Sequence, residues 1–376
     1  MRYFPPRARV RGLAVVLVLV AVTLGPADAA GATDGYEWAA LGDSYTAGDF
    51  VGDPRPGLGD PSRDGCDRTT DAYPGVVARA LARRPPAKPV HLTDVSCDNA
   101  VIGDITTTRQ TPVSPVQPPA GGWPPVDPQI RRAGLDAETD VVTIGVGGNS
   151  LPLGEVLLTC VERGAVGKSC RDYYAVPPAG TESVPDKLAR VRNEYTRMPA
   201  LVHRAAPGAE VITIGYPTIL PRQGTSCDPQ SLIELGAITH TDVDWYRDHV
   251  LEPLNDTIRQ ATSAFGDRYV DTYTSSIGHD ACQPEGTKWI EGICGNADDY
   301  WPAQVPDLLL NCALIGKRAT LVHPNAAGHT NTAARVEQAI RTALRRHRPG
   351  GRSPEPARPP RPSTATTTLT REALDT

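Results

Sequence analysis

Two polar residues directly follow apolar runs that are typical of buried β-strands, and a third lies much later in the chain. Ser44 follows the run 38–41 within Gly-Asp-Ser, and Asn149 follows the run 141–146 after two glycines. His323 lies just before the last helical stretch. A serine hydroxyl becomes a nucleophile once a histidine accepts its proton, and an amide N–H stabilises the oxyanion that then forms. These three residue types in this order predict a serine hydrolase.

The histidine of such a site needs an acceptor on its second ring nitrogen, which fixes the ring and its tautomer. Many hydrolases place an aspartate three residues before the histidine, but this chain has Thr320 there. We therefore expect the backbone carbonyl of Thr320 to accept the Nδ1–H of His323, giving a Ser–His dyad with a carbonyl helper. The Thr320 hydroxyl is the less favoured acceptor, and Asp280 is an outside candidate for a third member.

The oxyanion of the tetrahedral intermediate requires donors that are fixed in advance. The backbone N–H of Ser44 and the side-chain amide of Asn149 are two candidates. A third donor is expected from the segment 97–100, most simply the backbone N–H of Asn99. Two alternatives are structural: the Asp-Ser pair could simply cap the helix that follows, and Asn149 could be a turn residue. The presence of the histidine favours the catalytic interpretation.

The elements that must position these residues form one α/β pattern. Apolar strands at 38–41, 141–146 and 211–214 are each followed by glycine and a polar turn. Apolar residues recur at steps of three and four over residues 188–202, which predicts a helix, and another helix follows the histidine. Strands that alternate with helices imply right-handed crossovers and a parallel sheet. We expect an α/β fold that carries the polar residues at the carboxyl edge of this sheet.

The two ends of the chain differ in composition from its centre. Residues 1–29 combine four arginines, a short apolar stretch and the small residues Ala27-Asp28-Ala29, the pattern of a signal peptide. The apolar stretch is shorter than the ~20 residues that a membrane span requires. Residues 347–376 are rich in proline, arginine and threonine, which indicates a disordered tail. We expect a secreted, extracellular protein without stable membrane insertion, whose hydrolase domain spans residues 30–346.

Long stretches between the predicted elements fit no regular structure. Residues 53–71 and 111–128 are rich in proline, glycine and aspartate. Eight cysteines in an exported chain favour disulfides, and because no Cys-x-x-Cys occurs, we expect no metal site. Sequence order suggests disulfides that pin long irregular loops, residues 280–311 among them, with the pairs Cys66–Cys97, Cys160–Cys170, Cys227–Cys282 and Cys294–Cys312.

The net charge of −5 divides unevenly along the chain. The first 29 residues carry four arginines and one aspartate, and the residues from 345 onward carry seven arginines and three acids. The region between them is therefore strongly acidic, and a domain of this charge binds nucleic acid poorly. We expect a small-molecule or lipid ester as the partner, no cofactor, no nucleic acid, and a monomer.

Six motifs resemble those of the SGNH (GDSL-type) hydrolases, in particular the secreted, disulfide-bonded esterases and lipases of actinomycetes. They run in the family's order across nearly the whole domain: Gly42-Asp43-Ser44-Tyr45, Cys66-Asp67-Arg68 with Tyr73-Pro74, Gly147-Gly148-Asn149, Gly215-Tyr216-Pro217, His279-Asp280-Ala281-Cys282 and His323-Pro324-Asn325-Ala326-Ala327-Gly328-His329. The resemblance implies a three-layer, flavodoxin-like fold with long disulfide-bound loops. It also implies Ser44 and His323 as catalytic residues, and an oxyanion hole of Ser44, Asn149 and a residue of the block-two segment, here Asn99.

Two positions depart from the family pattern. After the block-two cysteine the family usually has Ser-Gly-Ala, where this chain has Asp98-Asn99-Ala100. Asn99 can replace the glycine only if it tolerates a positive φ, which asparagine does better than most residues. The family's Gly-Gly-Asn-Asp is Gly-Gly-Asn-Ser here, so Ser150 stands where a helper carboxylate is usual. We expect activity to persist with an altered rate or selectivity.

Several functions fit this site. The leading hypothesis is a carboxylic-ester hydrolase of the esterase or lipase type, which works through an acyl-enzyme on Ser44 with His323 as the base. The same site could instead transfer the acyl group to an alcohol or sugar, or remove acetyl groups from a polysaccharide. A third class is a non-catalytic wall- or glycan-binding protein on a degenerate hydrolase scaffold, supported by Asn99 and the basic tail.

Overall fold

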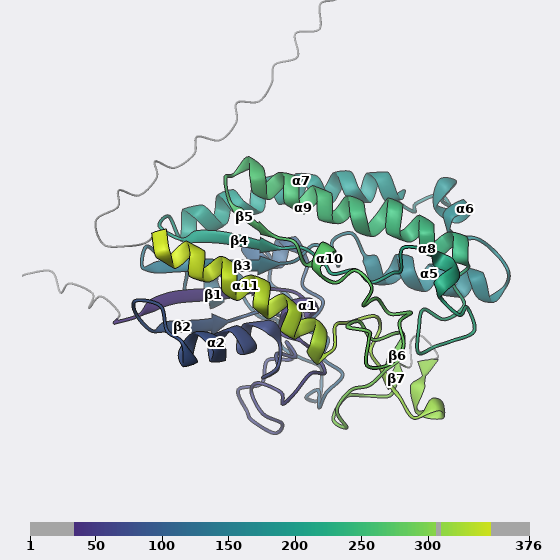
Figure 1. Ribbon diagram of the computed structural model, residues 1–376, viewed down its shortest axis with the longest axis horizontal. Coiled ribbons are helices and arrows are strands. Elements are labelled where there is room, and N and C mark those ends of the chain that lie inside the picture. The colour runs from purple at the N-terminus through teal and green to yellow at the C-terminus, as the bar shows by residue number, and fades with distance from the viewer. Residues whose placement is uncertain (1–33, 306–309, 347–376) are drawn as a thin grey trace, which may run out of the picture. The chain divides into compact units, whose positions relative to one another are not determined.

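A five-stranded parallel sheet forms the centre of the fold. The computed structural model describes residues 34–305 and 310–346, and Figure 1 shows the sheet with helices on both sides. The strands are β1 (Tyr36–Gly42), β2 (Val90–Asp94), β3 (Thr139–Gly145), β4 (Glu210–Ile214) and β5 (Arg268–Val270). All neighbouring strands are parallel, in the order β2-β1-β3-β4-β5, which is the flavodoxin-like order. The predicted α/β class and parallel sheet are confirmed.

Helices of different lengths connect the strands. The longer ones are α2 (Tyr73–Arg83), α5 (Leu153–Ala165), α7 (Val184–Ala205), α9 (Glu252–Ala264) and α11 (Ala326–Arg346). The shorter ones are α1 (Ser44–Ala47), α3 (Ile102–Thr106), α4 (Gln129–Arg132), α6 (Cys170–Ala175), α8 (His240–Tyr246) and α10 (Thr272–Ser275). A π-helical segment, η2 (Arg247–Leu251), continues α8 into α9, and η1 (Gly224–Ser226) and η4 (Cys312–Ile315) are 3₁₀ turns. Two small antiparallel pairs join β6 (Cys294–Gly295) to β9 (Arg318–Ala319) and β7 (Gln304–Val305) to β8 (Leu310–Asn311).

Alternation along the strands divides the buried side chains between two cores. On β1, Trp38 and Ala40 pack with the apolar faces of α2 and α11. Ala39 and Leu41 point the other way, into a core shared with α3, α5, α7 and α9. Successive side chains of a strand point to opposite faces, so a strand covered on both faces needs the continuous apolar run found in β1. The result is the three-layer arrangement that the resemblance implied.

The apolar runs of the sequence correspond to the three central strands, β1, β3 and β4. The helical periodicity over residues 188–202 falls inside α7, which begins at an N-cap, Ser183, whose hydroxyl accepts the N–H of Asp186. The pattern does not reveal the two edge strands. β2 alternates between half-buried and exposed residues, and β5 is only three residues long, so neither shows the apolar run of a central strand.

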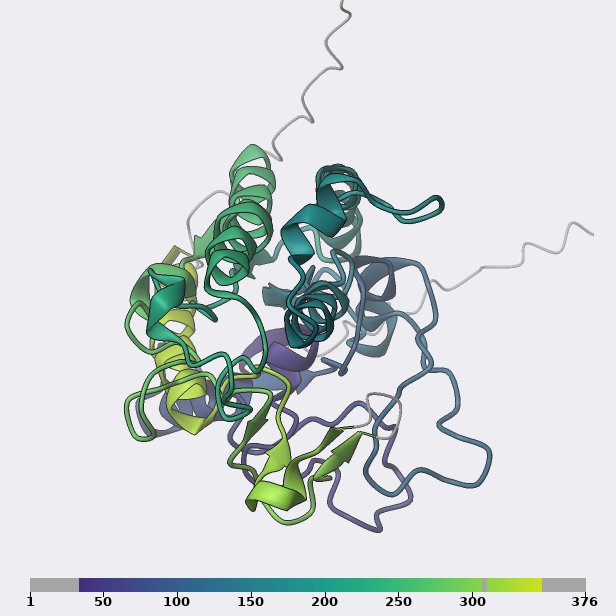
Figure 2. The same ribbon diagram turned by 90° about the vertical axis from the view of Figure 1, so that its right-hand side faces the viewer.

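Long loops collect where the strands end, and disulfides hold them there. The structure contains all four expected pairs: Cys66–Cys97, Cys160–Cys170, Cys227–Cys282 and Cys294–Cys312. The turn after α1 contacts a distant loop, because the Tyr300 hydroxyl donates to the carbonyls of Asp49 and Gly52 at 3.0 and 3.1 Å. Figure 2, which views the molecule from this end, shows these loops around α1.

The predicted signal peptide (1–29) and the predicted tail (347–376) lie outside the described residues and stay predictions. Among the residues that are described, no helix has the length and apolar character needed to cross a membrane.

Candidate active site

The end of β1 places Ser44 at the first position of α1. Asp43 is the N-cap of this helix, and its Oδ1 accepts the N–H of Tyr45 at 3.1 Å. A Cβ at Gly42 would lie 2.5 Å from the carbonyl oxygen of Gly145 on the neighbouring strand, so only glycine fits between these strand ends. Asp43 therefore caps α1, as the structural alternative expected. The side chain of Ser44 takes no part in this cap.

The Ser44 hydroxyl meets the ring of His323, which lies 279 positions later in the chain. His323 Nε2 is 2.8 Å from Ser44 Oγ, and Nδ1 is 3.0 Å from the carbonyl oxygens of both Thr320 and Leu321. Two carbonyl acceptors require a proton on Nδ1, so Nε2 carries the lone pair that faces the serine. Burial lowers the pKa of His323, against the opposing effect of the two carbonyls. The ring is therefore a neutral acceptor at neutral pH.

The segment before the histidine is strained and firmly held. Leu321 and Val322 have φ of 44° and 61°, a conformation that is unusual for a β-branched residue. The N–H of Val322 donates to Gly292 O at 2.9 Å, and its carbonyl accepts the Tyr45 hydroxyl at 2.7 Å. Strained backbone of this kind persists only where the surroundings determine it, and it is concentrated at functional sites.

A buried hydrogen-bond chain joins the ends of three strands beneath the serine. The Tyr216 hydroxyl, which follows β4, donates to Asp43 Oδ2 and accepts the N–H of Gly148 at 2.6 Å. Burial raises the pKa of the Asp43 carboxyl to about 7, while the bonds from Tyr216 and the Tyr45 N–H oppose the rise. Asp43 and Tyr216 thus fix the backbone on both sides of Ser44.

The two expected asparagines follow β2 and β3, the strands on either side of β1. Asn99 has a φ of 61°, the left-handed conformation that asparagine tolerates and that the family's glycine adopts freely. The N–H of Cys97, two residues earlier, donates to the carbonyl of Gly42 at 3.0 Å. Asn149 Nδ2 donates to the carbonyl of Ala100 at 3.2 Å. The Asn99 segment is therefore bonded both to the end of β1 and to Asn149.

Other residues singled out from the sequence have structural partners. The Asp280 carboxylate accepts the N–H of Cys282 and the amide of Gln283, so Asp280 does not orient the catalytic ring. The Thr320 hydroxyl donates to Gly292 O at 2.9 Å and is not the acceptor of the ring proton. Ser150, where a carboxylate is usual, accepts the N–H of Ile102 at the start of α3.

Sequence reasoning missed one acidic neighbour of Ser44 and His323. Asp49 lies in the turn after α1, and its Oδ2 is 4.0 Å from His323 Nε2. Burial raises the pKa of Asp49 well above its ordinary value, and the charges of Asp98 and Asp67 raise it further. No motif marks this residue, because its position depends on how the loop folds back.

One large cavity and the possible metal ligands lie away from Ser44. A cavity of about 540 Å³ is enclosed by residues of α6, α7, α8 and α9 and includes neither Ser44 nor His323. Within the described ranges, the one trio with metal-ligand spacing is Cys227, Glu234 and Cys282. Its two cysteines are bonded to each other, so this trio offers no thiolate to a metal.

Comparisons with known proteins find lipases and esterases. The profile of the GDSL-like Lipase/Acylhydrolase family matches residues 40–330. "Lipase 2" of Streptomyces coelicolor is 32% identical over 337 residues, which cover 85% of this chain and 93% of that protein. "Esterase" of Streptomyces scabiei is 26% identical over 363 residues, with coverages of 91% and 97%. The crystal structure of an extracellular lipase from Streptomyces rimosus aligns with 82% of this chain and all of that one, at 20% identity and a TM-score of 0.48.

The sheet order defines an α/β fold of flavodoxin-like architecture. The chain belongs to the GDSL-like lipase/acylhydrolase family and is a carboxylic-ester hydrolase.

Proposed function

We propose that the protein is a secreted esterase or lipase that cleaves its substrate through an acyl-enzyme on Ser44, with His323 as general base and acid. The observation that carries this proposal is the contact of 2.8 Å between Ser44 Oγ and His323 Nε2, with Nδ1–H held by two carbonyls. This is the geometry required of a nucleophile, its base and the group that orients the base.

In the acylation step, Ser44 Oγ attacks the ester carbonyl carbon while His323 Nε2 takes the hydroxyl proton. The oxyanion is stabilised by the N–H of Ser44, the N–H of Asn99 and the amide of Asn149. Collapse of the intermediate breaks the acyl–oxygen bond, and His323 returns its proton to the leaving alcohol. A water molecule, deprotonated by the same nitrogen, then releases the acid and restores the serine.

The proposed secretion rests on three observations. The N-terminal pattern of arginines followed by an apolar stretch and small residues is that of an exported chain. Four disulfides close the loops of the described domain, and such bonds persist in oxidising compartments. A similar protein of known structure is described as an extracellular lipase.

A series of p-nitrophenyl esters of increasing acyl length tests this proposal. Wild type should hydrolyse the series, and Ser44→Ala and His323→Ala should each lose most turnover while keeping the fold. Ser263→Ala and His91→Ala change exposed residues and serve as matched controls that should retain activity. Full activity in Ser44→Ala would contradict the proposal, and the preferred chain length would size the acyl site.

A further inference from the structure

A carboxyl group beside the catalytic ring has an unsatisfied oxygen. The residue Asp49 is 5% exposed, and its Oδ2 is 4.0 Å from the histidine nitrogen that carries the proton in the reaction. Its Oδ1 has no hydrogen-bond partner among the described residues. A buried carboxyl oxygen without a partner is costly, and such a group in a native protein calls for an explanation. A bound cation would supply one.

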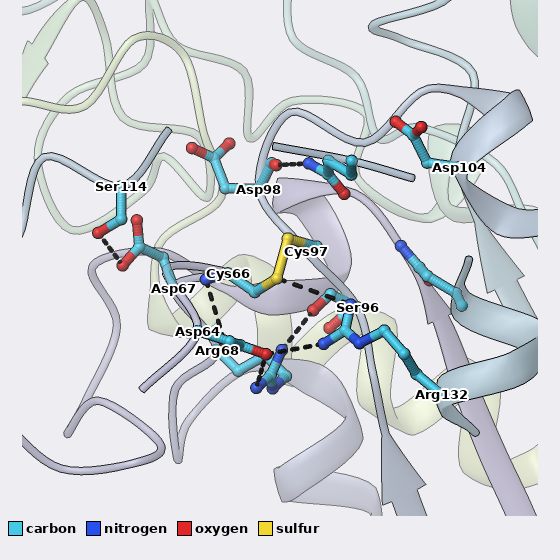
Figure 3. Close-up of a disulfide and its surroundings, with 12 residues drawn as sticks. Asp64, Cys66, Asp67, Arg68, Ser96, Cys97, Asp98, Asp104, Ser114 and Arg132 are labelled. Atoms are coloured by element: carbon cyan, nitrogen blue, oxygen red, sulfur yellow. Dashed lines mark hydrogen bonds and ion pairs between the residues drawn. A yellow bond between two sulfur atoms is a disulfide. The ribbon is translucent and has the colours of Figure 1, made fainter. Parts of the chain in front are cut away.

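Two further acidic side chains face the same region. Asp67 is 9% exposed, and its Oδ1 accepts the Ser114 hydroxyl at 2.6 Å, with Arg63 Nη2 at 3.7 Å. Its Oδ2, like the free oxygen of Asp49, has no hydrogen-bond partner within the described part of the chain. Asp98 is half-buried and carries its carboxyl on the same side of the Cys66–Cys97 disulfide as Asp67, as Figure 3 shows.

Apart from Arg63, which lies beside Asp67, two nearby arginines bind another carboxylate. Arg68 and Arg132 each bind Asp64 Oδ2, at 2.9 and 2.8 Å, on the opposite side of the disulfide (Figure 3). Burial raises the pKa of Asp67 to about 7 and that of Asp98 to about 6, and the charge of Asp98 contributes to the rise at Asp67. The aspartates therefore lie within one another's field, and the opposite charge in contact with them is that of Arg63, beside Asp67.

The spacing of the aspartates favours an organic cation over a metal ion. A metal needs ligand atoms gathered around one point, and no trio drawn from Asp49, Asp67 and Asp98 meets that spacing in the described chain. Aromatic rings pack around the imidazole that Asp49 approaches: the Tyr45 and Phe50 ring centroids are 4.9 and 6.4 Å from the ring centroid of His323. Dispersed carboxylates with aromatic rings suit a bulky ammonium group.

We propose that Asp49, Asp67 and Asp98 form a cation subsite for the alcohol part of the ester, so that the enzyme prefers esters of amino alcohols such as choline. The inference rests on the proposed function. His323 Nε2 must approach within about 3 Å of the leaving oxygen to protonate it, so the alcohol passes beside Asp49. In a choline ester the ammonium nitrogen is two carbons from that oxygen, within reach of the nearby carboxylates.

The cation takes no part in bond making or breaking. Ser44 still receives the acyl group, and its proton still passes through the ring to the leaving amino alcohol. The ammonium group also offsets the negative charge of Asp98, which stands next to the expected oxyanion donor Asn99 and would otherwise oppose the oxyanion.

The test compares butyrylcholine with 3,3-dimethylbutyl butyrate, in which a neutral carbon replaces the nitrogen. The ratio of their kcat/KM values is measured over neutral and alkaline pH, with EDTA and separately with Ca²⁺. Wild type should prefer the choline ester by about tenfold or more, the order of one desolvated contact to a quaternary ammonium group. Asp49→Asn and Asp98→Asn should each bring the ratio toward one, while Asp71→Asn, an exposed aspartate paired with Arg79, should leave it unchanged.

The wild-type ratio decides the question even if a variant does not fold. A ratio near one, or no turnover of butyrylcholine by an enzyme that hydrolyses p-nitrophenyl butyrate, overturns the subsite and leaves the hydrolase intact. A neutral-ester rate that requires Ca²⁺, without preference for choline, assigns the aspartates to a metal and also overturns it. Failure to hydrolyse any ester would overturn the proposed function itself.

Discussion

At the scale of single residues, the chemistry depends on which nitrogen of one imidazole carries a proton. The carbonyls of Thr320 and Leu321 both accept from His323 Nδ1, which leaves Nε2 free to take the proton of Ser44. A backbone carbonyl cannot titrate, so this arrangement holds the tautomer without a carboxylate. The orientation of the base is therefore insensitive to the pH changes that would protonate an aspartate.

The expected oxyanion donor Asn149 can be tested by truncation. Asn149→Ala should lower kcat by roughly 10²–10³, the usual cost of removing one oxyanion donor. KM and the unfolding midpoint should change little, because the side chain makes one bond, to Ala100. Asn193→Ala, at an exposed position of α7, is the matched control. Near-normal kcat in Asn149→Ala would remove this residue from the site.

The conformation of Asn99 makes a second prediction about the oxyanion hole. Asn99→Gly should keep the left-handed backbone at no steric cost and retain activity. Asn99→Val should lower both stability and kcat, because a β-branched residue at a φ of 61° pays a steric penalty of about 1–2 kcal/mol. Urea unfolding and p-nitrophenyl ester turnover measure the two effects. Equal activity in both variants would show that this backbone conformation is irrelevant to catalysis.

At the scale of elements, the position of the histidine depends on α11 and its packing against α2. His329 is 1% exposed near the start of α11, and its Nδ1 accepts the N–H of Tyr73 at the start of α2. Burial lowers the pKa of His329 to about 3. The helix α11 therefore packs against α2 through a histidine that must stay neutral.

This docking predicts a pH-dependent stability. The unfolded chain binds a proton at His329 below about pH 6.5, whereas the folded protein resists protonation until about pH 3. The contribution of His329 is thus present above pH 6.5 and is lost as the pH falls, at up to ~1.4 kcal/mol per unit. His329→Asn keeps an acceptor for Tyr73 without titrating. Urea unfolding at pH 5 and pH 7.5 should show a smaller acid loss in the variant, and equal losses would contradict the assignment.

At the scale of the whole molecule, four disulfides replace regular structure in the long loops. The Cys66–Cys97 bond joins the loop after α1 to the segment that carries Asn99, whereas Cys160–Cys170 links α5 to α6. A disulfide stabilises chiefly by restricting the unfolded chain. The first bond also fixes the distance between two parts of the site.

Removing each bond separates these two roles. Replacing Cys66 and Cys97 together by alanine should lower the free energy of unfolding by about 2–4 kcal/mol and should also lower kcat. The matched pair of changes at Cys160 and Cys170 should lower stability with little effect on kcat. Calorimetry and ester turnover give the two readouts. Unchanged thermal stability in both double variants would contradict a stabilising role for the disulfides.

The sequence is sufficient for those parts of the fold and site that depend on local pattern. Ser44 and Asn149 are predictable because each follows an apolar run whose end lies at the carboxyl edge of the sheet. The Leu321 carbonyl and Asp49 are not, since both reach the imidazole through loops without periodicity. The Tyr45 hydroxyl meets Val322 O across 277 positions, a contact that only the closed loops create.

The most direct test of the central claim is covalent labelling with a fluorophosphonate probe, followed by peptide mapping by mass spectrometry. The account predicts one label per chain, on Ser44, with none on Ser44→Ala and much slower labelling of His323→Ala. A label on another residue, or an enzyme that hydrolyses esters without being labelled, would contradict a Ser44 acyl-enzyme.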